Sequence, residues 1–101
     1  MCDCIVYDEY TPLVIACING YIDTVKQLID SGADVNSRDK HGDTSLIYAC
    51  SKGYINIAKL LISSGADVNS KDKDGDTPLH IACLGGNINI VKLLIDSGAE
   101  I

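Results

Sequence analysis

The sequence predicts an all-α solenoid in which three stacked helix–turn–helix units are joined by β-hairpin-like loops. The first observation is a period of 33 residues, which relates Thr11, Thr44 and Thr77 and recurs at several Leu, Ala and Gly positions. The second is that each unit contains the signals of two helices, and the third is a turn-rich link between units. Such a period indicates a repeat array, because one unit buries its apolar face only against its neighbours.

Each unit is expected to begin with a short helix. The repeated Thr is a favourable N-cap, and in two units Pro12 or Pro78 follows it at the first helical position, where a missing N–H does no harm. Leu and the pair Ala-Cys come next, at a spacing that lets a neighbouring helix approach closely. The helix is expected to end at Gly20, Gly53 or Gly86.

A second helix is predicted to pack antiparallel to the first. In the third unit it spans residues 88–96, with Ile, Val and Leu at i, i+3 and i+4 spacing, and Gly98 stands where a left-handed C-cap is needed. A link such as residues 33–42 then surrounds an extended Val with polar, turn-forming residues. We expect this link to form a projecting, hairpin-like loop.

Length and composition indicate one domain over residues 1–101, with repeat 1 at 6–38, repeat 2 at 39–71 and repeat 3 at 72–101. Without Trp or Phe, the core must consist of Ile, Leu, Val, Ala and Cys. The net charge of -6 argues against nucleic acid or anionic lipid as a partner. No apolar run approaches the roughly 20 residues of a membrane helix, and the first residues are acidic. We therefore expect an intracellular protein, cytoplasmic or nuclear, that is neither secreted nor membrane-bound.

The terminal repeats differ on their outer sides. Repeat 1 has Thr24 and Gln27 where the other repeats have Ile and Leu, which predicts an N-terminal cap. It also has Val6 and Glu9 where the others have Asp and Gly, so we expect this worn first unit to have an incomplete hairpin. In repeat 3, Val91, Leu94 and Ile95 stay apolar, so no C-terminal cap is apparent. Three explanations stay open: the chain is a fragment of a longer array, a second copy covers this face, or its exposure is tolerated. Weak self-association through this face is a side prediction.

The repeated motifs resemble those of the ankyrin repeats. They are T-P-L-H-I-A at residues 77–82, G-x-x-x-I-V-K-L-L at 86–94 and G-A-D-V-N at 65–69, and the match covers roughly residues 6–101. The resemblance implies a curved solenoid of L-shaped units whose loop tips and first helices line a concave face. It also implies that Asn36 and Asn69 are candidate hydroxylation sites, because both match the loop Asn that asparaginyl hydroxylases modify in similar proteins; the alternative is a structural role in the loop that needs no modification.

The cysteines are better explained by packing than by chemistry. Cys17, Cys50 and Cys83 share one repeat position, and helices about 8–10 Å apart are too distant for a disulfide, so we interpret all three as core residues. Cys2 and Cys4 form a C-x-C pair without the further ligands that a metal site needs.

No set of residues suggests catalysis. By the resemblance, His80 makes structural hydrogen bonds between helix and loop backbone, and His41 lies in a loop without a nucleophile beside it. None of the glycine-rich phosphate-binding spacings occurs. We therefore expect no enzyme activity, no cofactor and no metal.

Partner-binding residues are expected where the repeats differ at the loop tips and on the first helices. The best anchor candidates are Tyr7, Tyr10 and Tyr48, since aromatic side chains give large contact area at low entropic cost and are enriched at binding hot spots. For Tyr7 and Tyr10 the alternative is that they cover the first helix. The expected binding residues are Tyr7, Asp8, Tyr10, Arg38, Lys40, His41, Asp43, Tyr48, Ser51, Lys52, Lys71, Lys73, Asp74, Asp76, Ile81 and Leu84.

The sequence thus predicts a non-catalytic interaction module that binds a partner protein, of unknown identity, through loop tips and first helices. The alternative is a structural spacer, or a fragment of a longer ankyrin array whose binding surface lies elsewhere.

Overall fold

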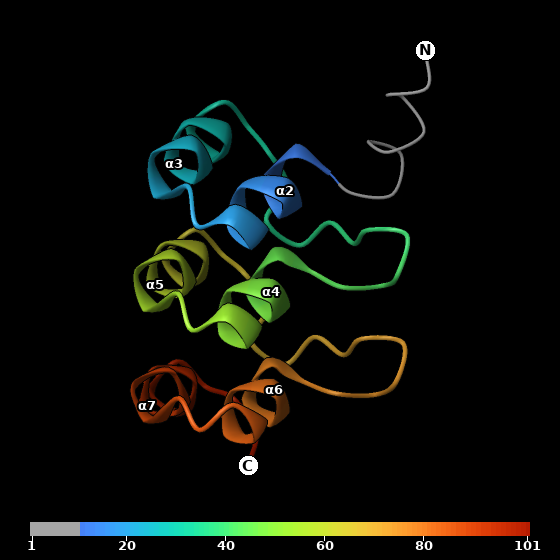
Figure 1. The fold of residues 1–101 in the computed structure, drawn as a ribbon, viewed down its shortest axis with the longest axis vertical. Coiled ribbons are helices and arrows are strands. Elements are labelled where there is room, and N and C mark those ends of the chain that lie inside the picture. Colours follow the sequence, from blue (N-terminus) through green and yellow to red (C-terminus); the bar gives the residue numbers. More distant parts are fainter. Residues whose placement is uncertain (1–10) are drawn as a thin grey trace.

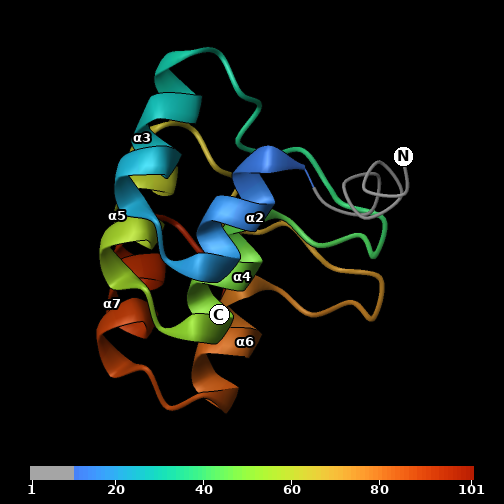
Figure 2. The same cartoon turned by 45° about the horizontal axis from the view of Figure 1, so that its top comes forward.

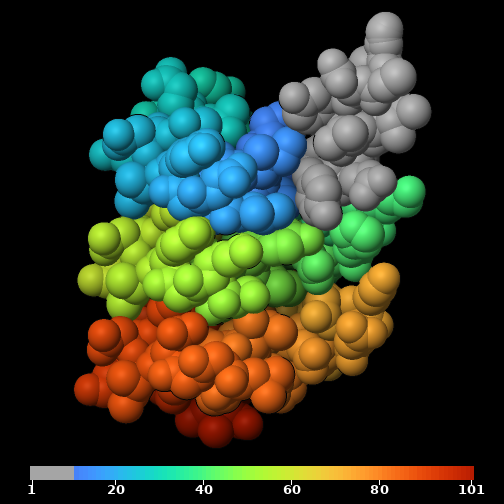
Figure 3. All heavy atoms as spheres, in the orientation of Figure 1, coloured from blue at the N-terminus to red at the C-terminus, as the bar shows by residue number. Residues whose placement is uncertain are grey.

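The computed structural model describes residues 11–101, which form six α-helices in three successive pairs (Figure 1). The first helices of the pairs are α2 (Pro12–Asn19), α4 (Ser45–Lys52) and α6 (Pro78–Leu84). The second helices are α3 (Ile22–Asp30), α5 (Ile55–Ser63) and α7 (Ile88–Asp96). Each pair forms one layer, and the layers follow one another in chain order, as the space-filling view also shows (Figure 3).

Contacts between layers join equivalent helices. Helix α4 contacts both α2 and α6, and α5 contacts both α3 and α7, so the second interface repeats the first. This arrangement confirms the predicted all-α solenoid of helix–turn–helix units. Within residues 11–101, no helix has the length and apolar character that crossing a membrane requires.

The N-terminus of each first helix is capped as the sequence predicts. The Oγ1 atoms of Thr11, Thr44 and Thr77 accept hydrogen bonds from backbone N–H groups three residues later, at 3.1, 3.4 and 3.3 Å. Gly20 and Gly53 follow α2 and α4 with φ of 75° and 77°, a left-handed conformation that glycine adopts without strain.

Helix α6 ends differently from the prediction, which placed its terminus at Gly86. The helix stops at Leu84 and Gly85 is its C-cap, with φ of -83°, while Gly86 has the left-handed φ of 70°. Gly85 stands where the other units have Asn19 and Lys52, and glycine has a lower helix propensity than either.

The links between layers leave the helices and return to them along one edge of the molecule (Figures 1 and 2). We call residues 34–44 loop 1 and residues 67–77 loop 2. Among the described residues, the pairing typical of β-structure is limited to one antiparallel bridge, between Arg38 and Thr44 in loop 1. The loops therefore follow a hairpin path without forming strands.

One apolar core runs through all layers, and two of the repeated cysteines belong to it. Cys17 and Cys50 are fully buried, and burial raises the pKa of their thiols to about 11 and about 12. The neighbouring Ser45 hydroxyl opposes this rise slightly at Cys17. Cys83 is exposed, so its prediction as a core residue is wrong. The reason is positional: the layer that follows covers Cys17 and Cys50, and α6 lies in the last described layer.

The outer sides of the terminal layers also differ in part from expectation. Thr24 and Gln27 of α3 are exposed, in keeping with polar side chains on that side. In α7, Val91 is half-buried and Ile95 is 41% exposed, but Leu94 is fully buried. Placing Leu94 on the bare face is therefore wrong, because its side chain belongs to the core of its own layer.

Candidate functional site

The two loops are tied to each other by hydrogen bonds between repeats. The Arg38 guanidinium donates through Nη1 to the carbonyl of Gly42 at 2.8 Å and to that of Lys71 at 2.6 Å. Gly42 in turn lies beside Lys73, whose Cβ would be 3.6 Å from a Cβ added at Gly42. Loops 1 and 2 therefore form one continuous surface rather than two separate projections.

The two asparagines predicted as hydroxylation sites, Asn36 and Asn69, also form hydrogen bonds between repeats. The side-chain amide of Asn36 donates to the Gly65 carbonyl at 3.1 Å, and its oxygen accepts from the Asp67 N–H at 2.7 Å. Asn69 makes the equivalent bonds to Gly98 and Glu100, at 3.3 and 2.9 Å. Both asparagines thus hold neighbouring repeats in register.

Loop 1 is shaped by one carboxylate. Asp39 Oδ1 accepts from the N–H groups of His41 and Asp43, at 2.8 and 3.0 Å, and the Tyr48 hydroxyl donates to Asp39 Oδ2 at 2.6 Å. In loop 2, Asp72 Oδ1 accepts two backbone N–H groups at the corresponding positions. Tyr48 is thus a half-buried residue that braces loop 1, in addition to being a binding candidate.

The ionisation of this cluster is shifted. Burial raises the pKa of the Asp43 carboxyl, the Tyr48 hydroxyl lowers it, and the charges of Asp39 and Asp72 raise it further. Burial also raises the pKa of Tyr48, as does its hydrogen bond to the Asp39 carboxylate, so its hydroxyl stays protonated at neutral pH. The base of loop 1 is therefore an acidic cluster that keeps Tyr48 as a donor.

The remaining candidates fall into two groups by exposure. Leu84, at the end of α6, is 81% exposed. The other exposed candidates are Arg38, Lys40, Ser51, Lys52, Lys71, Lys73 and Asp74. The half-buried candidates are His41, Asp43, Tyr48, Asp76 and Ile81. Tyr7, Asp8 and Tyr10, like Cys2, Cys4, Val6 and Glu9, lie outside the described residues. The exposed group consists of lysines on both loops and on α4, together with an apolar side chain at the far end of α6 from the loops.

His80 has a local structural role, in line with the role that the resemblance implies. Its Nδ1 accepts from the Thr77 N–H at 3.2 Å, while its own N–H donates to Thr77 Oγ1, so the two residues form a reciprocal cap at the start of α6. The Asp76 carboxylate lies 4.0 Å from the imidazole. Within the part of the chain that the structure describes, no cluster of three His, Cys, Asp or Glu could hold a metal ion.

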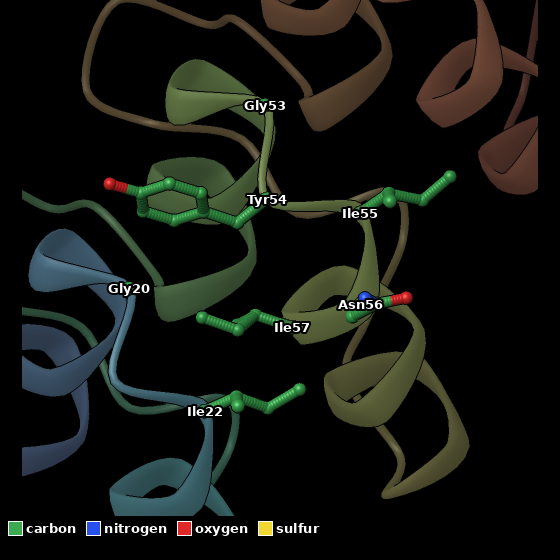
Figure 4. Close-up of a pocket in the computed structure, with 7 residues that line it drawn as sticks. All are labelled: Gly20, Ile22, Gly53, Tyr54, Ile55, Asn56 and Ile57. Carbon is green, nitrogen blue, oxygen red and sulfur yellow. The ribbon is translucent and has the colours of Figure 1, made fainter.

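Sequence reasoning missed one feature, an apolar hollow between the turns that join the two helices of repeats 1 and 2 (Figure 4). It has a volume of about 280 Å³, and the Tyr54 ring lies against Gly20 while Ile22, Ile55 and Ile57 line the rest. A hollow of about 260 Å³ lies at the equivalent place between repeats 2 and 3, with a more polar lining that includes Asn87 and Asn89. Both hollows lie at the opposite end of the first helices from the loops. The sequence did contain a signal for these hollows, because Ile recurs at the equivalent positions 22, 55 and 88 that line them.

Comparison with known proteins identifies the repeats. A sequence model described as ankyrin repeats (3 copies) matches residues 1–72, and one described as ankyrin repeats (many copies) matches residues 55–95. A stretch of 38 residues is 50% identical to "Serine/threonine-protein kinase VIK" of Arabidopsis thaliana. That stretch is 38% of the chain and 9% of the kinase, so the chain corresponds to a small part of that protein.

Proposed function

The chain belongs to the ankyrin-repeat family, and on this premise we propose that it binds a partner protein through loops 1 and 2 and the exposed parts of α4 and α6. Repeats of this family are in general protein-interaction modules and non-catalytic. The short match to a kinase lies within the repeats and supports no transfer of kinase activity.

The observation that carries this proposal is the hydrogen-bonded contact between the loops. Arg38 fixes loop 1 against the Lys71 carbonyl, so Lys40 and Lys73 are held in one surface. Preorganised side chains bind with a smaller loss of conformational entropy than mobile ones. Lys52 of α4 and the exposed Leu84 of α6 extend this surface along the first helices. A fitting partner presents an apolar side chain for Leu84 flanked by acidic groups.

The test is affinity capture from a cell lysate with two charge-matched variants. Lys52→Glu/Lys73→Glu changes the proposed surface, and Lys26→Glu/Lys59→Glu makes the same change of charge on the exposed sides of α3 and α5. We expect the first variant to lose captured proteins that the second retains, with equal thermal unfolding of both. Equal capture by both variants refutes this surface as the binding site.

A second candidate is that the chain serves as a spacer or as part of a longer repeat array. The exposed apolar side of repeat 3 favours it, because such a side is covered wherever another repeat follows. Full partner capture by the Lys52→Glu/Lys73→Glu variant supports this candidate. A second copy of the chain is a further candidate partner, through the same side of repeat 3.

Hydroxylation of Asn36 and Asn69 is a separate proposal. Both side-chain amides are engaged between repeats, so modification at these residues would act on the register of the links. An intact mass of protein from its native source, heavier by one oxygen atom per modified residue, is the expected result. An unmodified mass refutes it.

A further inference from the structure

Most of the exposed large apolar side chains of the described residues lie in repeat 3, at one end of the solenoid. We define the outer stripe as Cys83 of α6 with Ile88, Val91 and Ile95 of α7. Ile88 is 67% exposed, Ile95 is 41% exposed and Cys83 is exposed, whereas Val91 is half-buried. Of the described large apolar side chains that are exposed, Tyr21 alone lies outside repeat 3.

The same positions in the other repeats show what covers such a stripe. In repeat 2, Cys50 and Ala58 are fully buried, and in repeat 1 Cys17 and Val25 are fully buried. The Ile positions that correspond to Ile88 and Ile95 are half-buried there: Ile22, Ile29, Ile55 and Ile62. In both cases the cover is the helix pair of the following repeat. The outer stripe therefore continues an established interface beyond the last described layer.

The geometry of α7 makes this stripe a docking face. Ile88, Val91 and Ile95 follow i, i+3 and i+7 spacing, which places them along one side of a helix. Ile90 and Leu94 are buried on the adjacent, core-facing side. The stripe contains no charged residue, so a partner with an apolar face covers it without burying a charge.

We propose that a second copy of the chain covers the outer stripe, with the two stripes paired about a two-fold axis. The α7 helix carries both Lys92 and Asp96, exposed beside the stripe and opposite in sign. A patch with both signs at its rim is electrostatically compatible with its own copy, unlike a patch with one sign. A two-fold contact is closed and yields dimers only.

The leading side of repeat 1 fits the stripe less well. In the interfaces within the chain, the side that packs against such a stripe carries Ile57 and Leu60 in repeat 2, or Ile90 and Leu93 in repeat 3. Repeat 1 has Thr24 and Gln27 there, both exposed. In the competing arrangement, the outer stripe of one copy would pack head to tail against the leading side of repeat 1 in another copy. That contact would use an apolar hollow of about 290 Å³ beside Tyr21. Such a contact is not closed and would build open chains.

The test is sedimentation velocity of the chain over a concentration series up to about 1 mM, with three variants. We expect a monomer–dimer equilibrium that Ile95→Lys weakens by about tenfold or more, because a charge enters the paired apolar stripes. Asn89→Lys adds the same side chain outside the stripe on the same helix, and we expect it to leave dimerisation unchanged. Tyr21→Lys alters the leading side of repeat 1, and we expect no effect there either.

Salt and thiol chemistry provide independent readouts. The net charge of -6 opposes association, so the dimer fraction is expected to rise with salt, which screens this repulsion. In a Cys2→Ser/Cys4→Ser variant, Cys83 is the exposed thiol of the described residues, and its alkylation by a maleimide should slow as dimers form. A monomer at every concentration, open-ended oligomers sensitive to Tyr21→Lys, or dimers with unchanged Cys83 alkylation would each overturn the proposal.

Discussion

Replacing Ser45 with proline is expected to stabilise the protein. Ser45 is the first residue of α4 and is fully buried, and its hydroxyl lies beside the Cys17 thiol without forming a hydrogen bond of good geometry to any group in the described structure. The equivalent positions carry Pro12 and Pro78, and Pro78 is itself buried. The first N–H of a helix has no partner within the helix, so proline removes no hydrogen bond from α4 itself, and the bond that it does remove is the one from the Ser45 N–H that belongs to the Arg38–Thr44 bridge.

The backbone before this position already suits proline. Thr44 has φ -97° and ψ 166°, nearly the same as Thr77 before Pro78, with φ -93° and ψ 165°. This extended conformation is the one that a residue preceding proline favours. The surroundings of the two positions also correspond. Ser45 lies near the buried Cys17 of the preceding repeat, and the residue equivalent to Cys17 in the repeat before Pro78 is Cys50, which is also buried.

The magnitude combines two contributions. A buried hydroxyl without a partner costs about 1–3 kcal/mol. Restricting the unfolded chain with a compatible proline adds about 0.4–1 kcal/mol. Loss of the bridge hydrogen bond of the Ser45 N–H offsets about 0.5–1.5 kcal/mol of this gain. We therefore expect Ser45→Pro to raise the free energy of unfolding by about 1–2 kcal/mol, or the melting temperature by roughly 4–16 °C for a domain of this size.

Urea denaturation followed by far-UV circular dichroism measures this change. Ser45→Ala removes the hydroxyl without fixing φ, so we expect it to give the first contribution alone, about 1 kcal/mol. A Ser45→Pro variant less stable than both Ser45→Ala and the parent chain would refute the reasoning, because the internal match to Pro78 would then fail.

The remaining predictions concern the loops and the thiols. Arg38→Ala should lower the free energy of unfolding by about 1 kcal/mol through two lost hydrogen bonds, while Lys40→Ala, also exposed in loop 1, should change it little in the same urea titration. Burial raises the pKa of Asp43 above 3.8, so its contribution to stability is present below that pH and is lost as pH rises through the raised value. Asp43→Asn should remove this dependence from pH-dependent thermal melts, and an unchanged profile would contradict the assignment. Mass spectrometry after alkylation of native protein should find Cys83 modified and Cys50 unmodified, and equal labelling would contradict their difference in burial.

The sequence alone determined the repeat architecture and the local structure of each unit. The start of a helix is set by a Thr N-cap, with a following proline in two units, and its end by a glycine in the left-handed conformation. Both signals depend on interactions within a few residues of the chain. These signals predicted α7 at residues 88–96, and its observed bounds are Ile88–Asp96. The apolar period across the repeats likewise predicted the stacking of layers, because only stacking buries those positions.

The tertiary structure decided which member of a repeated set behaves differently. Cys17, Cys50 and Cys83 look alike in sequence, yet Cys83 is exposed because burial depends on the neighbouring layer and not on the residue's own repeat. Leu94 and Val91 are both apolar residues of α7, and only their positions around the helix separate core from outer side.

The same distinction applies to the candidate surface. The sequence located Arg38 and Tyr48 at positions that vary between repeats, but it did not reveal that both side chains brace the loops. Hydrogen bonds between residues 33 apart, such as that from Arg38 to Lys71, exist only once the repeats are stacked. Local sequence thus determines each unit, while contacts between units determine which side chains are left free for a partner.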